Sequence, residues 1–167
     1  MLRAKWYVGP NTKAWLENEA TWKMGDYYYS HLTDYLRFVL MYKYGGTYMD
    51  MDALWLKAPP SQVEFIGSDK SDTVASWFLD SSGTYLAPGV MKFSKGRKFI
   101  LNAAEDAFSS NYDPKCFNCV GPKIITSKIK EILPNGINFE ILPWYSLYPY
   151  PFFKATSVFF LIYLFLM

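Results

Sequence analysis

Two aspartates, Asp50 and Asp52, are separated by a single residue. The residues just before them, Thr47 to Met49, are rich in β-formers and predict a short strand that runs into the pair. In an extended chain, residues i and i+2 point to the same side, so both carboxylates can face one cation. Hard divalent cations such as Mg²⁺ and Mn²⁺ prefer oxygen ligands and often share them with a nucleotide diphosphate. The pair is therefore a candidate metal site, although an isolated Asp-x-Asp also occurs by chance in solvated turns.

A helix is predicted to precede this pair and to present two further polar side chains. Apolar residues recur at helical spacing from Leu32 to Tyr42, with Thr33 as the predicted N-cap and Gly45-Gly46 as the predicted end. Asp34 and Arg37 lie three residues apart, on one face of this helix. They could form a surface ion pair, which contributes little stability. Alternatively, Asp34 could hold sugar or ribose hydroxyls while Arg37 meets a phosphate or a sugar hydroxyl.

The rest of the chain alternates helical and strand patterns, which predicts an α/β fold. Further strands are expected in two halves around Pro88-Gly89 within residues 84–93 and at Ile137–Ile141, and further helices over residues 99–108 and from Gly121-Pro122 onward. Residues 61–83 suit a loop with one short element. In open α/β sheets, nucleotides bind at the carboxyl ends of strands, which is where this pattern places Asp50.

Composition narrows the classes of protein that this chain can be. With 167 residues, 51% hydrophobic and 19% charged, the chain suits one modest domain and does not resemble a disordered polyelectrolyte. A net charge of +2 gives no reason to expect nucleic-acid binding, and a single histidine excludes a multi-histidine metal site. Aromatic residues make up 20%, which suits both a core and contacts with sugar faces. The apolar run at residues 158–167 is half the length of about 20 residues that a membrane-spanning helix needs.

The segment from His31 to Asp52 resembles the DXD sugar-binding region of the α1,4-glycosyltransferases. The family order is an Asp, an Arg three residues later, Tyr-Gly-Gly, a Tyr and then Asp-x-Asp. The matching residues are Asp34, Arg37, Tyr44-Gly45-Gly46, Tyr48, Asp50 and Asp52. Weaker similarities follow at Gly89–Phe93, from Gly121-Pro122 to Thr126, and from Leu142-Pro143 to Tyr148-Pro149, so the resemblance runs from about His31 to Pro151.

This resemblance implies a GT-A-like α/β fold and a metal-dependent hexosyltransferase. The implied donor is a UDP-sugar, foremost UDP-galactose, the acceptor is a glycolipid or glycan, and the linkage is α1,4 with retention. The implied donor-binding residues are Asp34, Arg37, Tyr48, Asp50 and Asp52. Asp50 and Asp52 would hold Mn²⁺ or Mg²⁺, with Asp52 as the more direct ligand, and no residue can be assigned as a nucleophile. The family also implies a Golgi membrane protein whose catalytic part lies on the lumenal side.

The chain departs from the family pattern in two places. Family members carry a membrane anchor and a first β-α-β unit upstream, whereas thirty residues precede His31 here. We therefore expect a fold incomplete at its N-terminus, with residues 1–30 as a remnant, 31–151 as the glycosyltransferase region and 152–167 as an apolar tail of uncertain origin. Membrane association would then depend on an upstream anchor that this sequence lacks. Pro88 stands where the family has an Asn that contacts the donor sugar.

Three further features have both a functional and a structural interpretation. Trp144 and Tyr148 could form a platform for the acceptor sugar, although aromatic residues more often pack in a core. Cys116 and Cys119 form one Cys-x-x-Cys, which without a second pair does not favour a zinc site. The Golgi lumen that the resemblance implies favours a disulfide instead. His31 is expected to be a structural residue.

Two other functions compete with glycosyl transfer. A phosphohydrolase of the haloacid-dehalogenase type also places Asp-x-Asp after an apolar strand, with Asp50 as a covalent nucleophile. It would require Thr or Val at Leu54 and a later acidic pair, for which only Asp69 and Asp72 come close. The second alternative is a catalytically inactive, truncated glycosyltransferase-like fragment or a glycan-binding module.

Overall fold

A computed structural model describes residues 17, 25–51, 53, 62–68, 85–109 and 112–147. In chain order, the helices and strands are α3 (Tyr28–Tyr44), β1 (Gly46–Met49), β2 (Phe65–Ser68), β3 (Leu86–Phe93), α5 (Lys98–Asp106), α6 (Pro122–Ile132), the 3₁₀ helix η2 (Leu133–Asn135), β4 (Glu140–Leu142) and α7 (Trp144–Leu147). The fold is mixed α/β, as the sequence predicts, but the described elements do not alternate strictly, because three strands follow α3 before the next described helix. None of the helices in these ranges is both long and apolar enough to cross a membrane.

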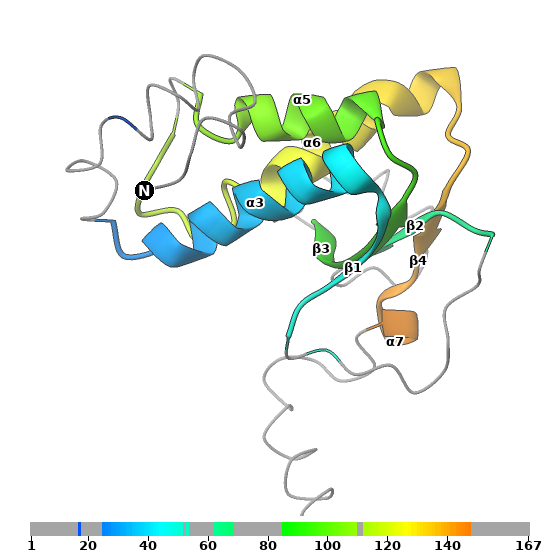
Figure 1. The fold of residues 1–167 in the computed structure, drawn as a ribbon, viewed down its shortest axis with the longest axis horizontal. Helices are drawn as coiled ribbons and strands as arrows, with labels where there is room; N and C mark the ends of the chain where they lie inside the picture. The colour runs from blue at the N-terminus through cyan, green and yellow to red at the C-terminus, as the bar shows by residue number, and fades with distance from the viewer. Residues whose placement is uncertain are drawn as a thin grey trace, which may run out of the picture.

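The four described strands form one mixed sheet in the order β1-β3-β2-β4. β3 pairs antiparallel with both β1 and β2, and β4 pairs parallel with β2. Helices α3, α5 and α6 lie together on one side of this sheet, and α7 lies away from them, beyond β4 (Figure 1). This mixed α/β arrangement fits a glycosyltransferase-like domain.

Strand β3 is continuous, whereas the sequence predicts two halves around Pro88-Gly89. The register with β2 passes from Ile66 opposite Met91 to Gly67 opposite Ala87, so the ladder is irregular where the proline lies. Proline has no N–H to donate, and such a bulge lets it sit inside a strand without leaving an unpaired partner. On the other side, β1 pairs with β3 as far as Met49.

Helix α3 begins earlier than predicted, and Thr33 is not its N-cap. The N-cap is Tyr27, and the first turn is joined to Gly25 by a 3.2 Å hydrogen bond from the Tyr28 N–H to the Gly25 carbonyl. Thr33 lies inside the helix, where its hydroxyl donates to the carbonyl of Ser30 at 2.9 Å. A threonine hydroxyl can bond the preceding turn in this way, so a good capping residue does not by itself mark a helix start. The predicted end is confirmed, since Gly45 adopts φ +64° immediately after the helix.

The core lies between the helical layer and the sheet. Its fully buried large side chains are Tyr35, Phe38, Phe65, Phe93, Ile66, Leu86, Met91, Ile100, Ile125, Ile129 and His31. His31 donates from Nε2 to the carbonyl of Cys116 at 2.9 Å and lies 2.8 Å from the Tyr112 hydroxyl through Nδ1. Burial lowers the pKa of His31, so the ring is neutral at physiological pH. The expected structural role of His31 is thus confirmed.

Candidate donor-binding site

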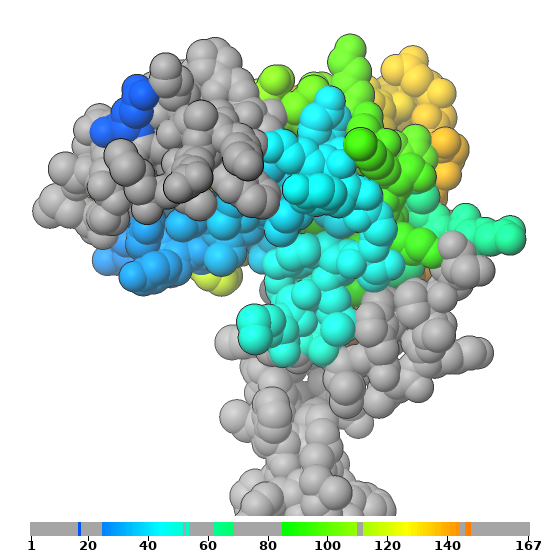
Figure 2. Space-filling view, in the orientation of Figure 1, coloured from blue at the N-terminus to red at the C-terminus, as the bar shows by residue number. Residues whose placement is uncertain are grey.

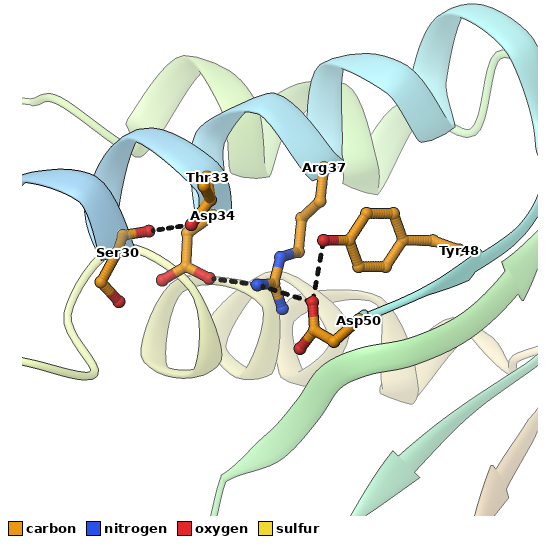
Figure 3. Close-up of polar contacts among 6 residues, drawn as sticks. All are labelled: Ser30, Thr33, Asp34, Arg37, Tyr48 and Asp50. Atoms are coloured by element: carbon orange, nitrogen blue, oxygen red, sulfur yellow. Dashed lines mark hydrogen bonds and ion pairs between the residues drawn. The ribbon is translucent and has the colours of Figure 1, made fainter. Parts of the chain in front are cut away.

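Arg37 contacts two aspartates that belong to different parts of the fold. One guanidinium nitrogen, Nη2, lies 3.2 Å from Oδ1 of Asp34 and 3.2 Å from Oδ1 of Asp50 (Figure 3). Asp34 and Arg37 are one turn apart on α3, whereas Asp50 follows the last residue of β1. Three of the residues that the sequence singles out therefore meet at one point.

Tyr48 completes this cluster from the strand side. Its hydroxyl donates to Oδ1 of Asp50 at 2.8 Å, and its ring centroid lies 5.0 Å from the guanidinium carbon of Arg37 (Figure 3). Tyr48 and Asp50 can meet because residues two apart along an extended chain share a side. A cation beside an aromatic face is itself favourable, so Tyr48 holds both the arginine and its acidic partner.

The backbone of Asp50 is also held by a hydrogen bond. Its N–H donates to the carbonyl of Gly89 at 2.8 Å, which extends the pairing of β1 with β3 by one residue beyond Met49. The segment from α3 through β1 lies on the face of the molecule shown in Figure 2. The strand thus delivers Asp50 to the surface at the point where α3 presents Arg37.

The Asp34–Arg37 pair is buried, so its interpretation as a surface ion pair is wrong. Asp34 is 5% exposed and Arg37 9% exposed, while the Asp50 side chain is 34% exposed. Burying an ion pair costs desolvation energy that a surface pair does not, and such pairs are rarely placed in a domain for stability alone. The cluster is therefore closed at Asp34 and open toward solvent at Asp50.

Burial shifts the pKa of two members of the cluster. It raises the pKa of Asp34 to about 6, with a further upward effect of the Asp50 charge and an opposing effect of Arg37. Burial also raises the pKa of Tyr48 to about 12, so this phenol stays protonated and remains a hydrogen-bond donor. The site thus combines a fixed cation, a permanent O–H donor and a carboxyl group that titrates close to neutrality.

Two atoms of the cluster have no recorded partner among the described residues. Nε of Arg37 is buried and has no hydrogen-bond partner among the described residues. Both contacts of the Asp50 carboxylate within that part of the chain go to Oδ1, which leaves Oδ2 for another group. A buried donor without a partner is costly, whereas Oδ2 belongs to a side chain that is 34% exposed and is the atom that a ligand can reach directly.

The remaining predicted site residues lie outside what the structure describes. Asp52, the second member of the acidic pair, and Tyr148 are both outside the described residues. Trp144 begins α7, but its side chain is not described. Among the described ranges, no three His, Cys, Asp or Glu side chains gather where a metal could bind.

Sequence reasoning missed one residue that touches the site. Gly121, the N-cap of α6, lies directly against the carboxylate of Asp34. The similarity of Gly121-Pro122 to a family helix start marked this position but gave it no role. Its contact depends on how α6 packs against α3, which local sequence does not contain.

One family model matches the part of the chain that contains this cluster. Residues 7–81 match the family model described as the glycosyltransferase sugar-binding region containing a DXD motif. The matched range includes all five predicted donor-binding residues, from Asp34 to Asp52. The match supports a glycosyltransferase family and a sugar-binding domain, and domains of this kind commonly bind divalent metals.

One curated protein is similar to this chain in sequence, and its name describes no activity. The chain is 33% identical, over 117 residues, to an uncharacterized protein of Arabidopsis thaliana. The matched region is 70% of this chain but 16% of the relative, so the chain spans a small part of that protein's length. No solved structure matches the chain.

Proposed function

We propose that this domain is a metal-dependent hexosyltransferase that uses a UDP-sugar, foremost UDP-galactose, as donor. In this proposal it transfers the hexose to a glycolipid or glycan acceptor in α1,4 linkage with retention. The observation that carries the proposal is Arg37, buried between Asp34 and Asp50 with Tyr48 on the same Asp50 oxygen. These four residues have the types and the order of the DXD family pattern.

The acidic pair supplies the oxygen ligands that a hard cation requires. Asp50 offers a partly exposed carboxylate oriented through one oxygen, and Asp52 would supply a second carboxylate two residues further along. We propose that these two residues hold Mn²⁺ or Mg²⁺. When bound, such a cation offsets the negative charge that develops on a departing diphosphate.

In this proposal, side chains on α3 and β1 position the sugar donor and the Asp50 carboxylate. Arg37, which already contacts the partly exposed Asp50, would donate from its guanidinium to a phosphate or sugar oxygen of the donor. Asp34 can accept from a sugar or ribose hydroxyl when ionised and is kept in place by Arg37. Tyr48 fixes the rotamer of Asp50 by its hydrogen bond, so the carboxylate is oriented before a ligand arrives.

The disulfide supports a lumenal location. The structure pairs Cys116 with Cys119. Disulfides persist in oxidising compartments and are rare in the cytosol. This agrees with the proposed Golgi lumen, where the domain would be held through an upstream anchor. Trp144 and Tyr148 remain the candidate platform for the acceptor sugar.

Calorimetric titration of UDP, with and without Mn²⁺, tests the proposal. The unchanged chain should bind UDP in a metal-dependent manner, and Asp50→Ala and Asp52→Ala should each weaken binding at least about tenfold, the effect of losing one charge-assisted contact. Asp106→Ala is the matched control, because Asp106 lies on α5 and pairs with Lys128 at 2.7 Å. UDP binding that neither site variant changes would contradict the transferase.

Turnover separates the transferase from a binding module. Release of UDP from UDP-galactose in the presence of a β-galactoside acceptor should require Mn²⁺ and be lost in Asp50→Ala. Metal-dependent binding of UDP without any transfer would instead indicate an inactive, glycosyltransferase-like domain.

A further inference from the structure

Gly121 packs its Cα against the carboxylate of Asp34. A Cβ added to Gly121 would lie 2.5 Å from Oδ1 of Asp34, with Cγ and Oδ2 still closer. Real Cβ atoms essentially never approach a heavy atom so closely, so one of the two groups would have to shift. Gly121 has φ −90° and ψ −86°, so its φ is ordinary while its ψ lies outside the helical range that other residues favour. Backbone strain in a Gly121 variant would be the same whatever residue stands at position 34, whereas the clash requires the Asp34 carboxylate.

Asp34 cannot move away without cost. Its side chain is short and 7% exposed, and its recorded partner among the described residues is Arg37 at 3.2 Å. A displaced Asp34 carboxylate would lengthen that contact, and Arg37 also holds Asp50. A change at Gly121 would therefore reach the exposed acidic end of the site through two ion pairs.

The backbone at Gly121 is held against α3 by the segment before it. His31, one turn before Asp34 on the same face of α3, contacts both Tyr112 and the carbonyl of Cys116. The disulfide from Cys116 to Cys119 closes the following turn. The N–H of Lys123 donates to the carbonyl of Asn118 at 3.0 Å, which fixes the start of α6. Gly121 therefore cannot easily retreat from Asp34 either.

We propose that Gly121 is a positioning residue of the donor site, which places the Asp34 carboxylate at Arg37 because it has no side chain. The donor-site role rests on the proposed function, whereas the coupling between Gly121 and Asp34 does not. Gly121 does not touch the donor in this proposal and acts only through Asp34.

A double-mutant cycle on the full chain tests this coupling. The variants are Gly121→Ala, Asp34→Ala and the double variant, each measured by urea denaturation. Gly121→Ala should lower the unfolding midpoint clearly when Asp34 is present and much less when position 34 is alanine, since alanine has no carboxylate to displace. An equal shift in both backgrounds would overturn the proposal. Asp34→Ala removes one of the two carboxylates that pair with Arg37, and the cycle subtracts its own loss of stability.

The affinity for the sugar donor is the measurement that should stay unchanged if Gly121 has only a structural role. With Mn²⁺ and UDP-galactose as the probe, Gly121→Ala should weaken binding at least about tenfold when Asp34 is present and less than about twofold in the Asp34→Ala background. Unchanged binding by a folded Gly121→Ala variant would overturn the positioning role. If the unchanged chain does not bind UDP-galactose, the proposed function fails and the donor-site role of Gly121 fails with it, while the stability cycle still reports on the coupling.

Gly136→Ala is the control. Gly136 has φ +81° with open space around it, so alanine there brings backbone strain without a new contact. It should lower the unfolding midpoint by the same amount in both Asp34 backgrounds and leave binding of UDP-galactose unchanged.

Discussion

Arg37 and Asp50 join helix α3 to the end of strand β1 through a 3.2 Å ion pair. The two residues come from different layers, so their contact fixes the distance between the helix and the acidic end of the strand. Asp34 holds the same guanidinium nitrogen from within the helix. Arg37 is therefore the residue whose replacement should affect both stability and ligand binding.

Replacing Arg37 with alanine should strongly destabilise the domain. The variant leaves the buried Asp34 without its cation, and removing one partner of a buried pair costs about 3–5 kcal/mol. Arg37→Lys should recover part of this loss, because a lysine keeps the charge but lacks the planar group that can lie beside Tyr48 and reach both carboxylates. Urea denaturation measures the change, with Lys43→Ala on the same helix as control. Equal stability of Arg37→Ala and the unchanged chain would show that the pair contributes nothing.

Stability should fall as pH rises from about 4 to about 6. The unfolded chain has an Asp34 pKa near 3.8 and the folded chain one of about 6, so the folded state binds the proton more tightly over that range. The contribution of Asp34 is fully present below the unfolded value and is lost as pH rises through the folded value. A shift of this size corresponds to about 3 kcal/mol at most. Asp34→Asn should remove this slope in the free energy of unfolding, and an identical slope in the variant would contradict the assignment.

Tyr48→Phe should weaken donor binding while leaving the fold intact. The phenylalanine keeps the ring beside Arg37 and removes the hydroxyl that donates to Asp50. One hydrogen bond to a carboxylate contributes roughly 1–2 kcal/mol, so affinity for UDP in the presence of Mn²⁺ should fall about five- to thirtyfold. Calorimetry measures the change, and Tyr44→Phe, at an exposed position that closes α3, is the matched control. Loss of binding in both variants would point to a general effect of removing hydroxyls.

Reduction of the Cys116–Cys119 disulfide should destabilise the domain modestly. The bond closes a loop with a sequence separation of 3, for which the chain-entropy estimate is about 2 kcal/mol. Adding reductant should lower the unfolding midpoint of the unchanged chain and have no effect on a Cys116→Ser, Cys119→Ser double variant. A midpoint that reductant does not change in the unchanged chain would contradict the prediction.

Local sequence patterns predicted the parts of the site that depend on short-range geometry. The helical spacing places Asp34 and Arg37 on one face. The strand period, which predicts a shared side for Asp50 and Asp52, equally brings Tyr48 to the same side as Asp50, although Tyr48 was marked only by the family resemblance. Gly45 ends α3 because its φ of +64° is one that other residues rarely adopt. These features need only the regular geometry of a helix and a strand.

The parts that could not be predicted depend on contacts between distant segments. Burial of Asp34 results from the packing of Gly121 against α3, and no pattern around Asp34 contains that information. The continuity of β3 through Pro88 likewise depends on an irregularity in its pairing with β2, where the residues between Ala87 and Met91 have no partner in the β2 register. Thr33 shows the reverse error, because it is a good local signal for a helix start, yet the helix already begins five residues earlier at Tyr28.

The order of strands has a consequence for the motion of the site. Within the described sheet, β1 has a single neighbour, β3, while α3 is packed into the core along its length. A strand held on one side exchanges its amide hydrogens through local opening more readily than a central strand or a packed helix. Fraying of β1 would carry Asp50 away from Arg37 while the helix stayed intact, so the acidic end of the site could detach and re-form without unfolding of the domain.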